Sequence, residues 1–73
     1  MSIRPFLHGA IFEPDVVRAM DDAFDSACRI VRAADNLVTQ EGLAEKIIAA
    51  AANGERDRER LRDIALRAYG IHR

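Results

Sequence analysis

A repeating pattern of apolar residues between Asp15 and Asp35 constrains the fold of this chain more than any other feature. Apolar side chains recur there at alternating steps of three and four residues, with acids and arginines between them. At about 100° per residue, this spacing lines them up along one side of an α-helix. A stripe this wide predicts a central helix that contacts two neighbouring helices. Its members are Val17, Met20, Phe24, Ala27, Val31 and Ala34, and it is widened by Val16 and Ala23.

Local signals indicate where this helix and two others begin and end. Pro14 suits the first turn of a helix, and Thr39 and Asp57 can cap exposed amide groups at the next two starts. Gly54 and Gly70 stand where a helix end favours a left-handed residue. The helices are therefore predicted over residues 14–35, 40–53 and 57–69.

The two shorter helices have predicted inner faces of their own. The inner face of the helix over 40–53 comprises Leu43, Ala44, Ile47, Ile48 and Ala51, and that of the helix over 57–69 comprises Leu61, Ile64, Ala65 and Ala68. Leu66 falls about 140° around from Leu61, so it is expected off the core face. Together with Tyr69, Leu66 is a candidate contact for a partner.

Residues 1–13 are predicted to form an N-terminal arm that precedes a domain over residues 14–73. Pro5 and Gly9 disfavour a regular helix there, but the arm is too apolar for a disordered tail. Phe6 and Phe12 can fold back onto their own chain or cross onto a second subunit, and both are candidate partner contacts. The predicted fold is all-α, a compact three-helix domain with an apolar N-terminal arm.

The chain has 73 residues, so its core is small and is expected to gain from a second copy or a partner. The single cysteine, Cys28, excludes a disulfide within the chain and favours a reducing compartment. A formal charge of −1 gives no net basic attraction to nucleic acid or anionic membrane. The sequence lacks a secretory signal pattern and an apolar run of membrane-spanning length, which predicts a cytoplasmic protein.

The acids Asp21, Asp22 and Asp25 invite a metal or acid–base interpretation, but they lack the loop and glycine of a calcium site. They are predicted to form a solvated acidic face. Cys28 is expected to be a small packing residue, since a mid-helix thiol is not activated and His8 lies in the predicted arm. The other histidine, His72, lies in the predicted C-terminal tail. We therefore predict a non-enzymatic protein with no catalytic residue, no metal site and no cofactor.

Arginines on the last helix are the best nucleic-acid candidates, with Arg58 and Arg62 as the proposed contacts. Glu59 and Asp63 are interleaved with them, and alternating signs are typical of a helix face that pairs its own charges. Nucleic-acid binding is therefore a disfavoured alternative.

Two stretches resemble a group of short bacterial helical proteins of unknown function. The first is Gly42-Leu43-Ala44-Glu45-Lys46-Ile47-Ile48, followed by Gly54-Glu55-Arg56-Asp57 and Leu61; the second is Phe12-Glu13-Pro14-Asp15, followed by Met20, Ala23 and Phe24. The resemblance implies a helical fold and a bacterial source, and it carries no activity or ligand.

The leading functional prediction is an interaction or regulatory protein that self-associates as a homodimer or docks a helix face on a partner protein. Its candidate contacts are Phe6, Phe12, Leu66 and Tyr69.

Overall fold

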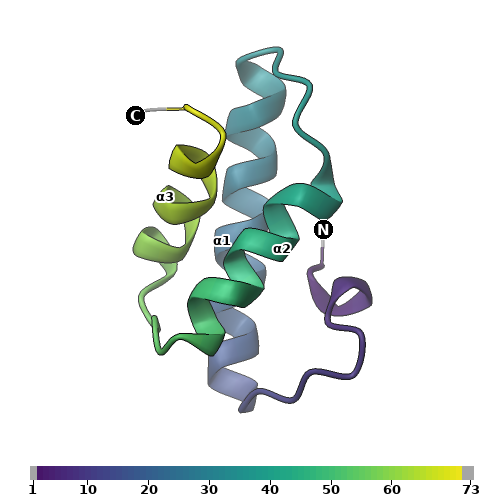
Figure 1. Ribbon diagram of the computed structural model, residues 1–73, viewed down its shortest axis with the longest axis vertical. Coiled ribbons are helices and arrows are strands. Elements are labelled where there is room, and N and C mark those ends of the chain that lie inside the picture. The colour runs from purple at the N-terminus through teal and green to yellow at the C-terminus, as the bar shows by residue number, and fades with distance from the viewer. Residues whose placement is uncertain (1, 72–73) are drawn as a thin grey trace.

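The computed structural model describes residues 2–71, which contain helices joined by loops and no β-strand. A single-turn 3-10 helix, η1, spans Arg4–Phe6, and the three α-helices are α1 (Pro14–Ala33), α2 (Gln40–Ala52) and α3 (Arg58–Ala68). Figure 1 shows α2 crossing α1, with α3 alongside both. The predicted all-α, three-helix fold is confirmed.

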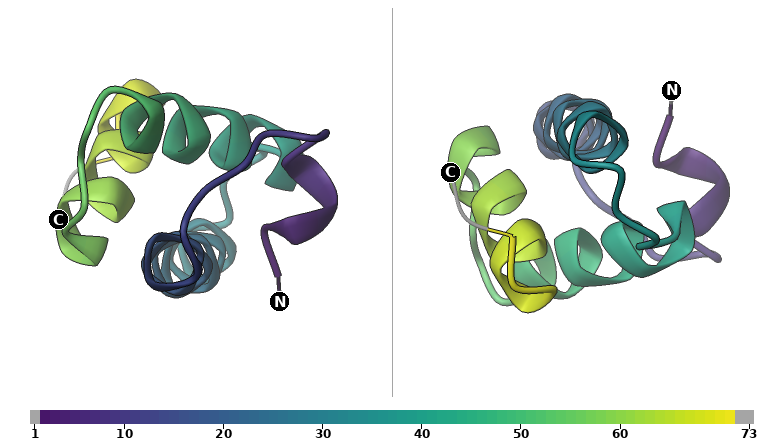
Figure 2. Two further views of the ribbon diagram at one scale, coloured as in Figure 1. Left: turned by 90° about the horizontal axis from the view of Figure 1, so that it is seen from below. Right: turned by 90° about the horizontal axis from the view of Figure 1, so that it is seen from above.

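Each helix contacts the other two, and η1 contacts α2. Viewed along α1, α2 bridges the molecule, with α3 beneath one side of it and the arm beneath the other (Figure 2). One side of α2 therefore faces α1, while the opposite side lies outermost.

The core is formed by apolar side chains from all three helices and from the arm. Met20 and Phe24 of α1, Ile47 of α2 and Leu61 of α3 are fully buried, and so is Ile3 of the arm. The predicted stripe on α1 is buried from Val16 to Val31, whereas Ala34 is exposed because it follows the end of the helix. Among residues 2–71, no polar or charged residue is buried.

The predicted inner face of α3 is wrong at three positions. Leu66 is 1% exposed and belongs to the core, while Ile64 is 41% exposed and Ala68 is also exposed. The reason is that α3 lies against both α1 and α2, so its buried surface is rotated toward Leu66 and away from Ile64. Leu61 and Leu66 project from α3 in directions about 140° apart. Both can be buried only because two helices, α1 and α2, pack against α3.

All three α-helices end in the same hydrogen-bonded motif, in which a left-handed residue follows the cap. At the end of α2, the Gly54 N–H donates to the Ala51 carbonyl and the Glu55 N–H to the Ala50 carbonyl. Gly54 and Gly70 hold this position with φ of 103° and 74°, as predicted from the sequence. Asp35 holds it after α1 with φ of 53°, which the sequence did not signal.

Asp35 gives a direct test of this local geometry. Replacing Asp35 with glycine removes the Cβ that disfavours a left-handed backbone, so stability should rise by roughly 0.5 to 1 kcal/mol. Urea unfolding measures the change. The matched control is Ala34→Gly, at a residue with φ of −84°, which should lower stability. A loss of stability on Asp35→Gly would contradict the assigned backbone conformation.

Candidate functional site

The carboxylate of Asp21 on α1 binds three described residues of the N-terminal arm. Its Oδ1 accepts a hydrogen bond of 2.7 Å from the Ile3 N–H and one of 3.2 Å from the Ser2 hydroxyl. Its Oδ2 lies 3.3 Å from a guanidinium nitrogen of Arg4. The prediction that Asp21 belongs to a solvated acidic face is wrong, because its side chain is only 20% exposed and holds the arm.

The two phenylalanines of the arm pack against their own chain. Phe6 is half-buried, and its ring centroid lies 5.6 Å from that of Phe24 in a tilted arrangement. Phe12 is also half-buried and packs against the core. Of the two arrangements left open by the sequence, this structure has the arm folded back on its own subunit.

The Asp21 contact can be tested by comparing two adjacent aspartates. Asp21→Ala removes an acceptor for a backbone amide and should destabilise the fold by about 1 to 2 kcal/mol more than Asp22→Ala. Asp22 is a matched control, since it gains the same helix propensity and loses only an exposed ion pair with Arg58. Urea unfolding gives the difference, and hydrogen exchange at the Ile3 amide reports release of the arm. Equal effects of the two substitutions would contradict the assigned role.

Tyr69 lies over the start of α2. A Cβ built at Gly42 would be 2.6 Å from the Tyr69 hydroxyl oxygen and 3.2 Å from Thr39 Oγ1, so a larger residue at 42 requires Tyr69 to move. Thr39 itself caps α2, accepting a hydrogen bond of 3.0 Å from the Gly42 N–H. Although Tyr69 is 38% exposed, its ring therefore has a structural role against Gly42.

A double-mutant cycle isolates this contact. In a Tyr69→Ala background, Gly42→Ala should stabilise α2 by roughly 0.5 to 1 kcal/mol, the usual gain from replacing a helical glycine. With Tyr69 present, displacement of its ring should cancel that gain or reverse its sign. Thermal unfolding of the four proteins measures the coupling, and the same gain in both backgrounds would contradict the contact.

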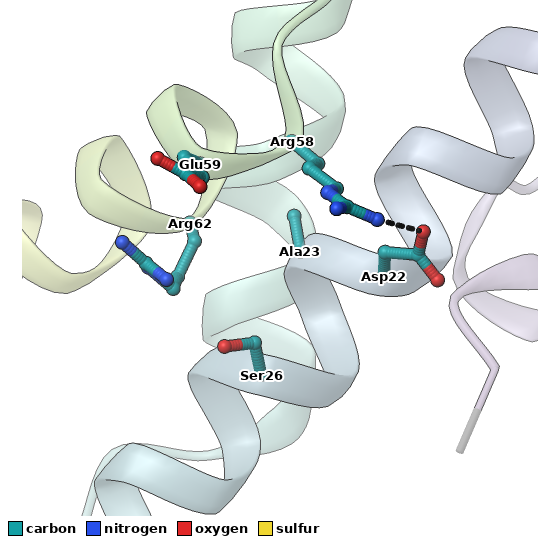
Figure 3. A pocket seen from close by; sticks show the side chains of 6 residues that line it. All are labelled: Asp22, Ala23, Ser26, Arg58, Glu59 and Arg62. Carbon is teal, nitrogen blue, oxygen red and sulfur yellow. Dashed lines mark hydrogen bonds and ion pairs between the residues drawn. The ribbon is translucent and has the colours of Figure 1, made fainter.

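A small polar cleft of about 240 Å³ lies between α1 and α3 (Figure 3). Arg58 reaches across it to Asp22, 3.4 Å away, and the Arg62 Nε lies 3.0 Å from Asp63 on its own helix. Both proposed nucleic-acid contacts thus lie beside a carboxylate, and an incoming phosphate would have to compete with it.

Cys28 is buried, as predicted for a packing residue. Burial, with a smaller contribution from the nearby Asp25 carboxylate, raises the pKa of its thiol, which keeps it protonated and weakly nucleophilic. Within residues 2–71, no cluster of three or more His, Cys, Asp and Glu side chains could hold a metal ion. His72, the other histidine considered with Cys28, lies outside the described residues.

An apolar hollow lies on the flank of α2 that faces the arm. A groove of about 410 Å³ runs between the arm and α2; we call it the arm groove. Its apolar walls are Phe6 and Leu7 on one side and Ile48 and Ala49 on the other. Glu41 and Glu45 also line it and place negative charge along the same flank of α2.

A second, shallower hollow of about 550 Å³ lies on the other flank of α2, against α3; we call it the α3 groove. Ala49 lines both grooves, so it lies at the centre of the exposed side of α2. Ile64 lines the α3 groove from α3, and Lys46 lines it from α2. The arm groove, Ala49 and the α3 groove together form the α2 outer face.

Three charges of α2 have no ion-pair partner among the described residues, as is also true of Arg18 and Arg32 on α1 and of Arg67 on α3. Asp21, Asp22 and Asp25 of α1 each have an arginine within ion-pair distance, but Glu41, Glu45 and Lys46 have no ion-pair partner within residues 2–71. Glu45 and Lys46 are adjacent, so they project about 100° apart and do not face each other.

Sequence reasoning missed this face, although one signal pointed to it. Besides its core residues, α2 carries Ala49 and Ala52 on the side away from α1, and its few charges do not form a polar face. A helix that is apolar around most of its circumference is typical of one covered on more than one side. The sequence had instead indicated Leu66, which is buried, as the spare contact.

Comparison with known proteins gave no significant match to a protein-family model, to a curated protein or to a solved structure. Among the described residues, no helix combines the length and apolar character needed to cross a bilayer.

Proposed function

We propose that this chain is a non-enzymatic interaction protein that binds another protein surface through the α2 outer face. The observation that carries the proposal is the pair of grooves that flank Ala49, with Ile64 exposed on one flank and an apolar arm groove on the other. When a partner covers such apolar side chains, the free energy falls by about 25 cal/mol for each Å² of apolar surface removed from water.

The charge pattern supports the same proposal. Three charges on α2 lack a partner within residues 2–71, and unpaired charges at the rim of an apolar centre give an interface its orientation. Of the four partner contacts predicted from the sequence, Phe6 remains a candidate because it forms a wall of the arm groove. Phe12 and Tyr69 pack within the fold, and Leu66 is too deeply buried to reach a partner.

A cytoplasmic location forms part of the proposal and is supported by the buried free thiol of Cys28, which suits a reducing compartment. Nucleic-acid binding through Arg58 and Arg62 is disfavoured, because each of these arginines lies beside an acid.

The proposal is tested by placing a large charge at the centre of the face. Ala49→Arg at the native locus should convert the complex containing this protein in cell extracts to the 8.1 kDa monomer, measured by size-exclusion chromatography. Ala49 is exposed and arginine is a good helix former, so the fold should persist.

The matched control is Ala33→Arg, at an exposed residue at the end of α1, which should leave the complex unchanged. A native protein that migrates as a free monomer, or an identical effect of the two substitutions, would contradict docking through α2.

A further inference from the structure

We infer that the occupant of the α2 outer face is a second copy of this chain, with the two α2 helices side by side and parallel. This inference rests on the proposed function and names the partner for the same surface. It rests on the charges and apolar groups that a two-fold axis would bring together at this surface.

The two flanks of the α2 outer face are chemically different. The arm flank is concave and acidic, with Glu41 and Glu45 beside the apolar walls of the arm groove. The α3 flank carries Lys46 and the large exposed side chain of Ile64, together with Glu55, whose carboxylate lies 4.0 Å from a guanidinium nitrogen of Arg60. The α3 flank therefore offers Lys46 as a cation for the two glutamates of the arm flank, and Ile64 as an apolar side chain for the arm groove.

A two-fold axis that brings two such faces together must lie in the plane between them. If it runs across α2, the helices are antiparallel and each arm flank faces the other arm flank. Glu41 and Glu45 of one copy then lie opposite the same acids of the second copy, and like charges facing each other are unfavourable. The antiparallel arrangement is therefore disfavoured.

If the axis instead runs along α2, the helices are parallel and each arm flank faces the α3 flank of the second copy. Glu45 then lies opposite Lys46 of the second copy, displaced along the axis by one residue, or about 1.5 Å. Symmetry repeats the pair, so two ion pairs form. Neither can form within one chain, because the two residues are neighbours on the helix.

The apolar groups match in the same arrangement. Ile64 of the second copy lies on the flank that faces the arm groove, where Phe6, Leu7 and Ile48 line the walls. Ala49 lies on the axis and meets its own counterpart, and its small side chain lets the helices approach closely. The parallel pairing thus joins opposite charges and fills the arm groove in one step.

The test is sedimentation velocity of the purified full chain from micromolar to millimolar concentration. The wild type should form a dimer, and Glu45→Lys or Lys46→Glu alone should each weaken it by at least about tenfold in dissociation constant. An equimolar mixture of the two variants should dimerise, because one chain then presents two lysines at these positions and the other presents two glutamates. The doubly exchanged variant, Glu45→Lys with Lys46→Glu, should also regain the dimer.

The matched control is Arg18→Glu, a charge reversal at an exposed residue of α1, which should leave the dimer unchanged. Circular dichroism of each variant confirms that the fold is retained. A wild type that stays monomeric at millimolar concentration overturns this inference, and so does a mixture of the two single variants that fails to dimerise. If Ala49→Arg nevertheless dissolves the cellular complex, docking through α2 stands and the partner is a different protein.

Discussion

The apolar stripe on α1 is wider than one neighbouring helix can cover, and the rest of the fold follows from burying it. The stripe extends around α1 from Met20 to Val16 and Ala23, and α2, α3 and the arm share the task of covering it. Because the chain is short, even Ile3, near its N-terminus, is drawn fully into the core. The Asp21 carboxylate supplies the polar contact that fixes the arm there. The arm is thus part of the core rather than an appendage to it.

Because α2, α3 and the arm together cover α1, the different sides of α2 have different neighbours. One side of this helix packs on α1, and its flanks contact α3 and the arm, so no element within residues 2–71 covers its outermost side (Figure 2). The grooves on both sides of Ala49 are the spaces left between α2 and its two neighbours. The same architecture that closes the small core therefore creates the hollow surface on which our functional proposal depends.

Features set by nearby residues were predictable from the sequence, and features set by distant contacts were not. The three helices, the caps at Thr39 and Asp57 and the left-handed Gly54 depend on a few neighbours in the chain. The buried face of α3 depends on where two other helices lie. For this reason the sequence wrongly placed Ile64 in the core and Leu66 outside it. Asp21 escaped prediction because it binds a backbone amide 18 residues away, and no sequence pattern encodes that partner.

Solvent paramagnetic relaxation of the backbone amides, measured by NMR at low and high protein concentration, tests the central claim most directly. The claim is that the core closes within one chain and that the α2 outer face is the surface left to be covered. It predicts protection at Ile3 at every concentration, together with protection that rises with concentration only around Glu45, Lys46, Ala49 and Ile64. An exposed Ile3 at low concentration, or concentration-dependent protection on the outer side of α1 instead, would contradict it.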